Sequence, residues 1–290
     1  MAANGATPER GAVVITGAST GIGAACALRL DGMGFRVFAG VRRPADGDAL
    51  KAKGSSRLTP LIIDVTDAAQ IAAAVDTVRA ATGERGLAGL VNNAGIVVAA
   101  PLEFVPLDDL RRQLEVNVVG QVAVTQAFLP MLRDARGRIV FMGSIGGRMS
   151  TPFIAPYNAS KFALEAITDA LRLELRPWGI HVSIIEPGSI ATPLWDKSQA
   201  AADALEQQMP KALEMYGPAV DAVRKAAVEF ADRGIPPDAV AKFVAHALTA
   251  KTPKTRYIVG RDARLQAALV KIVPDRMRDR LVAGQLKLPR

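Results

Sequence analysis

A tyrosine and a lysine four residues apart could carry acid–base chemistry in this chain. Tyr157 and Lys161 precede a run of strong helix formers that starts at Phe162, so we expect both side chains on one face of a helix. A free phenol has a pKa of about 10, and a nearby ammonium favours the phenolate and lowers that pKa. The pair could therefore exchange a proton with an alcohol or a carbonyl group. Because any amphipathic helix can produce this spacing by chance, the rest of the chain has to supply a site around it.

A glycine-rich segment could bind the phosphates of a nucleotide. The apolar stretch 12–16 predicts a short strand, Gly17 to Gly23 follow with the spacing G-x-x-x-G-x-G, and 24–30 predicts a helix. The glycines allow a tight turn and a close ligand, and the free N–H groups at the start of the helix favour an anion such as a pyrophosphate. The spacing differs from G-x-G-x-x-G, so for this segment alone a plain strand-to-helix turn remains an alternative.

Two arginines directly follow the second predicted strand. The stretch 35–41 ends in Val41, and Arg42 and Arg43 follow without a carboxylate. In a dinucleotide-binding fold an acidic residue here would bind the ribose 2′-hydroxyl, whereas an arginine would accept a 2′-phosphate. A solvated basic turn is the simpler alternative.

Short apolar stretches alternate with helical patterns along the whole chain. Beyond the first two strands, five more are expected, at 58–63, 87–91, 138–142, 180–185 and 256–259. This alternation predicts an α/β fold with a doubly wound parallel sheet of about seven strands and helices on both faces. Ligands of such sheets bind at the carboxyl ends of the strands, so the polar segments after strands one, four, five and six should meet at one site. We expect a single domain over the 290 residues.

Two further polar residues lie where this fold would need them. Asn117 interrupts the apolar character of a long predicted helix at 107–133, as does Gly120, and a buried amide there must find a hydrogen bond. Ser144 follows directly after the predicted strand at 138–142.

Together these motifs resemble those of the short-chain dehydrogenase/reductase family, in its compact single-domain branch with a Rossmann-type sheet. The second strand and 184–188 are loosely similar to retinol and 17β-hydroxysteroid dehydrogenases. The matched motifs are TGxxxGxG at Thr16 to Gly23, NNAG at Asn92 to Gly95, a catalytic tetrad at Asn117, Ser144, Tyr157 and Lys161, and a nicotinamide segment at Pro187, Gly188 and Thr192.

The resemblance implies an oxidoreductase that transfers a hydride between a nicotinamide and a secondary alcohol or ketone. Ser144 would hold the substrate oxygen and Tyr157 would give or remove its proton. Lys161 would lower the pKa of the phenol and bind the nicotinamide ribose, and Asn117 would anchor a water that links Lys161 to solvent.

The resemblance also implies a set of residues that bind the cofactor, with Asp64 and Val65 beside the adenine. The absence of an acidic residue after the second strand favours NADP(H), with NAD(H) as the alternative. No metal site is expected. The cofactor-binding set is Gly17, Ser19, Thr20, Gly21, Ile22, Gly23, Arg42, Arg43, Asp64, Val65, Asn93, Ala94, Gly95, Tyr157, Lys161, Pro187, Gly188, Ile190 and Thr192.

Three other functions are weaker. An epimerase or dehydratase of this family would usually have a larger domain for a sugar nucleotide. A catalytically silent NAD(P)-binding sensor would not need Tyr157 and Lys161 together. The net charge of +8 could favour nucleic acid, but 261–290 holds eight basic and three acidic residues, without interleaved aromatics. We therefore expect a small-molecule substrate and no nucleic acid.

The segment 189–236 is expected to form loops and short helices that cover the pocket as a lid. Five large residues in it would make the substrate lipophilic, such as a steroid, a retinoid or a fatty or polyketide carbonyl. The alternative is that they close a small core. These residues are Leu194, Trp195, Met209, Met215 and Tyr216.

The two ends of the chain and its single cysteine give the remaining expectations. The polar segment 1–10 should be flexible, without the apolar core of a signal peptide. Cys26 alone allows no disulfide within the chain, so a reducing compartment and a cytoplasmic location are expected. A homo-oligomer, either a dimer or a tetramer, is also expected.

The basic tail at 261–290 should form two short helices divided by Pro274. Its apolar stripe of Leu265, Leu269 and Ile272 is predicted to pack on the body of the protein or on a partner subunit. Contact with a membrane surface is an alternative, which we do not favour.

Overall fold

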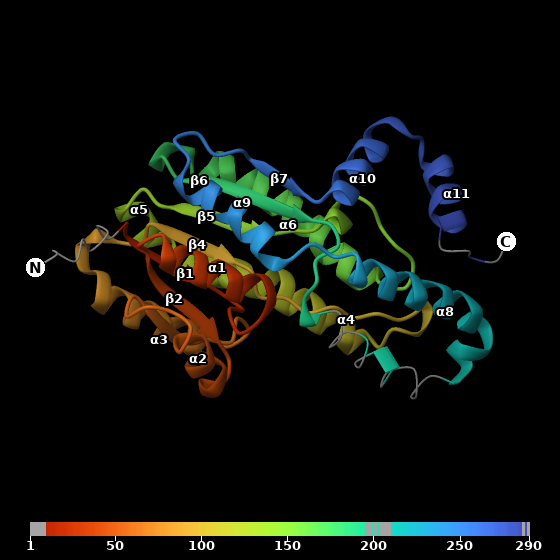
Figure 1. Cartoon of the computed structure of the whole chain (residues 1–290), viewed down its shortest axis with the longest axis horizontal. Coiled ribbons are helices and arrows are strands. Elements are labelled where there is room, and N and C mark those ends of the chain that lie inside the picture. Colours follow the sequence, from red (N-terminus) through yellow and green to blue (C-terminus); the bar gives the residue numbers. More distant parts are fainter. Residues whose placement is uncertain (1–9, 195–198, 200–201, 204–209, 286–287, 289–290) are drawn as a thin grey trace, which may run out of the picture.

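A parallel β-sheet forms the centre of the molecule (Figure 1). The computed structural model describes residues 10–194, 199, 202–203, 210–285 and 288. Within these residues the sheet has seven strands in the order β3-β2-β1-β4-β5-β6-β7, and every neighbouring pair is parallel. This confirms the predicted fold class. The strands are β1 (Ala12–Ile15), β2 (Arg36–Val41), β3 (Leu58–Ile62), β4 (Gly89–Asn92), β5 (Arg138–Met142), β6 (His181–Pro187) and β7 (Arg256–Val259).

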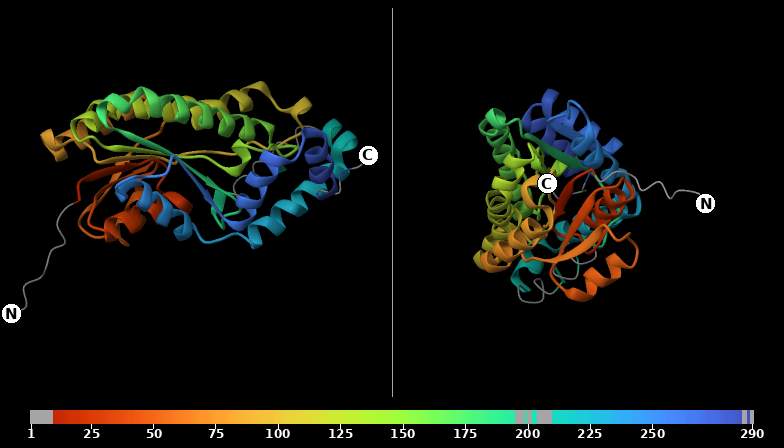
Figure 2. Two further views of the ribbon diagram at one scale, coloured as in Figure 1. Left: turned by 90° about the horizontal axis from the view of Figure 1, so that it is seen from above. Right: turned by 90° about the vertical axis from the view of Figure 1, so that its left-hand side faces the viewer.

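Both faces of the sheet are buried, which explains why its strands are apolar throughout. In β1, Val13 and Ile15 face one core while Ala12 and Val14 face the other, since successive side chains of a strand point to opposite faces. Figure 2 shows helices on either side of the sheet. One face carries α1 (Gly21–Gly32), α2 (Pro44–Lys51) and α9 (Pro237–Thr249), and the other carries α3 (Ala68–Thr82), α5 (Gly120–Asp134) and α6 (Ala155–Glu174).

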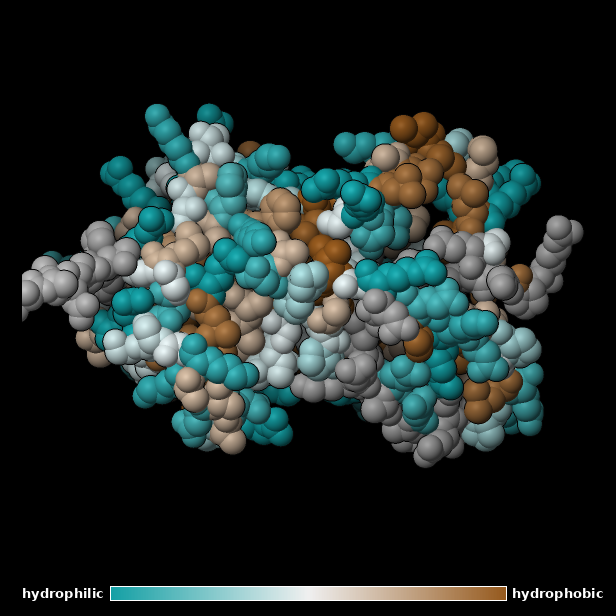
Figure 3. Space-filling view, viewed as in Figure 1, coloured by the Kyte–Doolittle hydropathy of each residue, from teal (hydrophilic) through white to brown (hydrophobic). Residues whose placement is uncertain are grey.

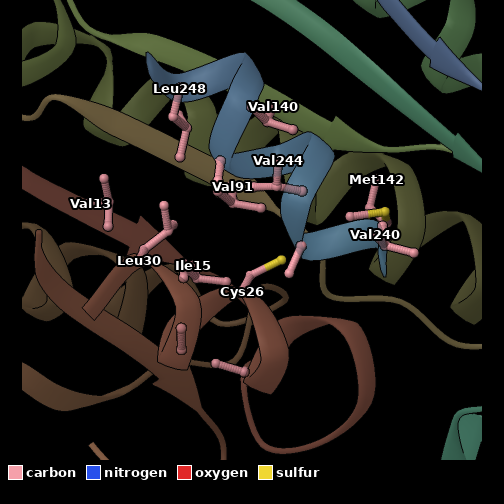
Figure 4. Close-up of a cluster of buried hydrophobic side chains, with 14 of the residues drawn as sticks. Val13, Ile15, Cys26, Leu30, Val91, Val140, Met142, Val240, Val244 and Leu248 are labelled. Atoms are coloured by element: carbon pink, nitrogen blue, oxygen red, sulfur yellow. The ribbon is translucent and has the colours of Figure 1, made fainter. Parts of the chain in front are cut away.

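The core between α1, α9 and the sheet is made of aliphatic side chains (Figure 4). Cys26 and Leu30 of α1 and Val244 of α9 point toward Ile15 and Val91 of the strands. All five are fully buried. This packing holds the first turn of α1 at the carboxyl end of β1, where the glycine-rich segment lies.

The long predicted helix at 107–133 is interrupted, as the sequence indicated. A π-helical turn at Glu115–Val119 separates α4 (Leu107–Leu114) from α5. Such turns inside helices are frequent at functional sites. Asn117 lies in this turn and is fully buried. A Cβ at Gly120 would lie 2.7 Å from the carbonyl oxygen of Val65, so glycine lets the helix approach the chain after β3.

The prediction of loops and short helices for 189–236 is wrong for most of the described residues of this segment. The structure has one helix of 23 residues there, α8 (Pro210–Asp232), with Pro218 inside it. The proline and Gly217 indicated a break, but the alanine-rich sequence on both sides favours a continuous helix. Trp195 and Met209 lie outside the residues that the structure describes, as do 1–9 of the predicted N-terminal segment.

The basic tail forms two helices, as predicted, but two of the three residues of its apolar stripe do not pack on the body, and packing on a partner subunit stays a prediction. In α10 (Arg261–Ile272), Leu265 is 64% and Ile272 is 80% exposed, whereas Ala263 and Ala267 are buried. The alanines contact Ile145, since their small side chains let the helix lie close to the body. Apolar residues therefore gather on the surface over α10 and α11 (Asp275–Gln285) in Figure 3.

Short 3₁₀ turns complete the fold, at Gly83–Arg85, Leu102–Phe104, Ile145–Gly147 and Arg176–Trp178. Among the helices of the described ranges, none is long and apolar enough to cross a membrane. Nor do the described side chains include a group of three His, Cys, Asp or Glu residues that could hold a metal ion.

Candidate active site

A cavity of about 820 Å³ opens at the carboxyl ends of the strands. It brings together residues that the sequence analysis took from seven separate segments, and of the predicted site residues only Gly23, Arg43 and Asn117 are not among those that line it. The predicted residues in its wall are Gly17, Ser19, Thr20, Gly21, Ile22, Arg42, Asp64, Val65, Asn93, Ala94, Gly95, Ser144, Tyr157, Lys161, Pro187, Gly188, Ile190 and Thr192.

The glycine-rich segment forms a tight cradle at the start of α1. Gly17 and Gly21 have φ angles of +64° and +57°, which other residues rarely adopt. A Cβ at Gly23 would lie 2.2 Å from the carbonyl oxygen of Gly17, so Gly23 allows the loop to pack on the helix rather than touching a ligand itself. Within the described chain, the side chain of Thr20 does not cap the helix, so the N–H groups of its first turn remain available to an anion.

A buried threonine joins this cradle to the segment after β4. The Oγ1 atom of Thr16 accepts hydrogen bonds from the backbone N–H groups of Asn93 and Ala94, both at 3.0 Å. In return, Nδ2 of Asn93 donates to the carbonyl oxygens of Thr16 and Gly17, both at 3.0 Å. Thr16 was missing from the predicted site residues. Its place at the end of an apolar strand was the available signal, because a buried hydroxyl must find partners.

Asn117 lies behind the cavity and links two parts of its wall. Its Oδ1 atom accepts from the N–H of Ile96 at 2.8 Å, and its Nδ2 atom donates to the carbonyl oxygen of Ile96 and to Oγ of Ser160, each at 3.0 Å. The side chain thus fixes the chain after β4 against α6. Its role as a water anchor stays a prediction.

Ser144 and Tyr157 meet at the inner end of the cavity. Ser144 follows β5 and accepts a hydrogen bond from the N–H of Gly146 at 3.0 Å, while Tyr157 lies in the first turn of α6. Burial raises the pKa of Tyr157, and its hydrogen bond with Ser144 opposes this only partly. The expected net lowering of this pKa is therefore not seen, because burial is the larger effect, and the influence of Lys161 on the phenol stays a prediction.

Lys161 is buried one helical turn after Tyr157. Its Nζ atom donates to the carbonyl oxygen of Met142 at 2.8 Å and lies 5.5 Å from the centre of the Tyr157 ring. Burial lowers the pKa of Lys161 from 10.5 to about 8. The lysine therefore remains mostly protonated at neutral pH and places a positive charge near the phenol.

The two arginines after β2 point to different places. Arg42 lines the cavity, next to Val41. Arg43 instead makes a bidentate pair with Asp46, in which Nε and Nη2 donate at 2.9 and 2.8 Å. Its inclusion in the cofactor-binding set is therefore not supported. Asp64, at the same end, accepts from the N–H and hydroxyl of Thr66 at 3.0 and 2.7 Å.

The turn after β6 is held by the start of α10. The N–H of Ser189 donates to Oδ2 of Asp262 at 2.7 Å. A Cβ at Gly188 would lie 2.2 Å from the same carboxylate oxygen, so glycine is required for this approach. Further along, Thr192 lies against Gly21 of the cradle, where a Cβ would come within 3.2 Å.

Only some of the predicted lid residues line the cavity. Leu194 lines the cavity, as expected, but Met215 is 62% exposed, so its prediction as a pocket residue is wrong. Tyr216 lies outside the cavity wall. It donates a hydrogen bond to Glu103 at 2.7 Å and makes edge contacts with Phe104 and Phe153 at 6.1 and 6.0 Å between ring centroids. Tyr216 thus ties α8 to the two loops beside the cavity.

Other residues of the cavity wall were not predicted. Most of these residues are next to predicted site residues at the ends of strands, so the sequence could have indicated them. The residues on α4 and the π-helical turn became apparent only from the tertiary structure. The unpredicted wall residues are Gly40, Val41, Ile63, Thr66, Ile96, Val97, Arg111, Arg112, Glu115, Val116, Met142 and Gly143.

Comparisons with known proteins agree with this geometry. A family model described as short chain dehydrogenase matches residues 11–203. The chain is 37% identical to an NADPH-dependent 3-dehydrocapnine reductase of Ornithobacterium rhinotracheale, over 94% of this chain and 96% of that protein. It is also 37% identical to mouse retinol dehydrogenase 5, over 96% of this chain and 89% of that protein.

Two solved structures that resemble this one are also short-chain dehydrogenases. A short-chain dehydrogenase from Streptomyces avermitilis superposes with a TM-score of 0.75 at 27% identity, covering 96% of this chain and 97% of that one. A short chain dehydrogenase from Burkholderia cenocepacia J2315, in complex with NADP, has a TM-score of 0.71 at 26% identity, covering 97% and 99%.

Proposed function

This chain belongs to the short-chain dehydrogenase/reductase family and is an NAD(P)(H)-dependent oxidoreductase that acts on alcohols or ketones; from this premise we propose that it prefers NADP(H) and a lipophilic substrate, with Tyr157 as acid and base. The observation that carries the proposal is the cavity at the carboxyl ends of the strands, which has Arg42 in its wall after β2 and Ser144, Tyr157 and Lys161 after β5 and at the start of α6.

The wall of this cavity fits a dinucleotide. The glycine cradle leaves no room for side chains and directs the N-terminus of α1 at the place of a pyrophosphate. Asp64 and Val65 would border the adenine, and Pro187, Gly188 and Ile190 would border the nicotinamide. When bound there, the nicotinamide supplies or accepts the hydride.

The residues of the chain itself would handle the proton. In the direction of ketone reduction, the hydroxyl groups of Ser144 and Tyr157 hold the carbonyl oxygen, and Tyr157 donates its proton as negative charge develops there. The raised pKa of Tyr157 keeps the phenol protonated at neutral pH, as a proton donor requires. The ammonium of Lys161 stabilises the phenolate that remains.

Arg42 supports the preference for NADP(H). A guanidinium matches phosphate geometry with a planar fork of donors, and a carboxylate that would repel a 2′-phosphate is missing at Val41. Hydrogen bonds to charged groups contribute about 1.5–3 kcal/mol each, which corresponds to tenfold or more in affinity. The reductase from Ornithobacterium is NADPH-dependent and the Burkholderia structure is a complex with NADP, which supports the same choice.

Apolar residues in the cavity wall support a lipophilic substrate. Val97, Ile190 and Leu194 line the cavity, and the name of one relative includes retinol. We expect long-chain, steroid or retinoid carbonyl compounds to be turned over with higher kcat/KM than short, charged or sugar-like ones. Better turnover of the latter group would contradict this part of the proposal.

Neighbouring arginines offer a matched test of the cofactor preference. The ratio of kcat/KM for NADPH over NADH should exceed ten in the wild type and fall by tenfold or more in Arg42→Ala. Arg43→Ala removes the same charge from a side chain that is held by Asp46, and it should keep the wild-type ratio. A wild type that favours NADH, or equal ratios in both variants, would overturn the proposal.

A cytoplasmic location and a homo-oligomeric state complete the proposal. A single cysteine, Cys26, supports a reducing compartment. Exposed Phe162 and Leu173 on α6 support contact with a second subunit. Cell fractionation and light scattering on the purified protein test these two points.

A further inference from the structure

A buried ion pair joins two loops that border the reacting end of the cavity. Nη2 of Arg148 donates to Oε1 of Glu186 at 2.8 Å, and Nε of the arginine lies 2.5 Å from Oε2. Glu186 is fully buried. Arg148 follows Ser144 by four residues, and Glu186 directly precedes Pro187, so the pair fixes the substrate-side loop against the nicotinamide-side turn.

A second arginine extends these contacts to the catalytic helix. Nε of Arg256, at the start of β7, donates to Oε2 of Glu165 at 3.0 Å, and its Nη2 donates to Oδ2 of Asp169 at 2.6 Å. The same Nε lies 3.6 Å from Oε1 of Glu186. Arg148, Glu165, Asp169, Glu186 and Arg256 thus form one cluster, here called the Glu186 network.

The spacing along α6 connects this network to the catalytic residues. Tyr157, Lys161, Glu165 and Asp169 follow one another at intervals of four, so they lie along one face of the helix. The first two enter the cavity, and the last two are held by Arg256. A rotation or shift of this face would move the phenol and the ammonium together.

Burying a carboxylate such as Glu186 is costly unless cations compensate it, and apolar side chains of similar size often stabilise a fold as well as a buried ion pair does. The directional bonds of a guanidinium fix positions more closely than apolar contacts can. We propose that the Glu186 network has a positioning role. It holds Ser144, the turn after β6 and the catalytic face of α6 in the relative positions that the reaction requires. This inference rests on the proposed function.

Glu165 gives the network a dependence on pH. Burial, and secondly the charge of Glu186, raise the pKa of Glu165 to about 7, against the opposing influence of Arg256 and Arg148. Asp169, on the next turn, also faces Arg256. The ionised form of Glu165 pairs with Arg256, so kcat should rise as the pH rises through about 7. In Glu165→Gln this inflection should disappear, and its persistence would contradict the assignment.

Glu186→Gln is the decisive variant because it keeps the shape of the side chain and removes its charge. Its matched control is Asp31→Asn. The carboxylate of Asp31 is also buried, and it accepts hydrogen bonds from the N–H and hydroxyl of Ser55 at 2.7 and 2.6 Å, at the end of α1 remote from Ser144. Both variants lose a buried charge, so only a positioning role predicts different kinetics.

The measurements are kcat and KM per active site, with sites counted by titration of NADPH fluorescence, and amide hydrogen exchange of the protein without ligand. In Glu186→Gln, kcat should fall tenfold or more with a smaller change in KM, and 144–149 and 186–190 should exchange faster. Asp31→Asn should keep the wild-type kcat and the wild-type hydrogen exchange of these two segments, and lose only thermal stability. A kcat of Glu186→Gln within twofold of the wild type would overturn the proposal.

Two further comparisons keep the test decisive. If Glu186→Gln does not fold, Arg148→Lys retains the positive charge but cannot contact both carboxylate oxygens through Nη2 and Nε, and at least a threefold lower kcat is expected. Absence of wild-type turnover with every carbonyl compound would count against the proposed function. The exchange data would then decide alone, with unchanged protection at 144–149 counting against the network.

Discussion

The glycine cradle of the cavity wall and the helix α8 are held in place differently. Up to Gly188, glycines with unusual backbone angles and buried hydrogen bonds such as those of Thr16 leave little freedom. Beyond it, α8 is tied to the loops by the ring and hydroxyl of Tyr216. The comparison shows that buried hydrogen bonds and close backbone contacts fix the glycine cradle, whereas the hydrogen bond from Tyr216 to Glu103 that helps to hold α8 is exposed.

The largest expected effect lies in the cavity wall. Tyr157→Phe removes only the transferable proton, so turnover should fall by about 10³-fold or more, whereas the affinity for NADPH should change less than threefold. Steady-state kinetics and fluorescence titration measure the two quantities. Activity near that of the wild type would refute the acid–base role.

A methyl group at Gly23 should damage the same part by steric means. In Gly23→Ala the new Cβ would lie 2.2 Å from the backbone oxygen of Gly17, so the cradle must shift. We expect a loss of about 1–3 kcal/mol in the free energy of unfolding and at least tenfold weaker binding of NADPH. Gly32→Ala, on the same helix, is the control: no described atom lies within 4 Å of its Cβ.

That control should be neutral or stabilise the protein by up to about 1 kcal/mol, because alanine favours a helix over glycine. Urea unfolding curves and cofactor titrations of the two variants give the comparison. Equal behaviour of both would show that the close approach at Gly23 has no consequence.

Loss of the contacts of Tyr216 on α8 should have a weaker effect. Tyr216→Ala loses two aromatic edge contacts, each worth about 0.5–1.5 kcal/mol, so KM for the carbonyl substrate should rise roughly three- to tenfold while NADPH affinity stays the same. Met215→Ala, next to it but exposed, should leave KM unchanged. A larger loss of NADPH affinity than of substrate affinity would mean that α8 supports the cofactor instead.

The last prediction concerns the dependence of stability on pH, which changes gradually and mostly above the neutral range. The pKa of Lys161 is about 8 in the folded protein and near 10.5 when unfolded, so the unfolded chain binds more protons between these values. The cost of burying the ammonium is therefore fully present below pH 8 and is relieved as the pH rises from about 8 to 10.5. Relative to Lys161→Met, the free energy of unfolding of the wild type should rise by at most about 1.4 kcal/mol per pH unit in this range, measured by denaturant unfolding.

Local patterns explain why the cavity wall was predictable. The bounds of β5 and β7 agree with the sequence prediction, and the interruption at Asn117 was visible as an amide among valines. The pairing of Arg43 with Asp46 follows from a spacing of three residues and could have been foreseen.

Long-range packing determined what could not be predicted. Leu265 and Ile272 gave the stronger apolar pattern, yet Ala263 and Ala267 face the body because only small side chains fit between α10 and Ile145. In the same way, the pKa of Tyr157 depends on burial by elements distant in sequence, which the spacing to Lys161 does not reveal.

The buried position of Cys26 makes the protein convenient for labelling. The thiol lies in the core between α1, α9 and the sheet, and burial raises its pKa to about 12, so almost no thiolate forms at neutral pH. It is the one cysteine of the chain. A single cysteine introduced at an exposed position of α8, such as Met215, would therefore take up a maleimide dye or spin label selectively, without prior removal of native thiols.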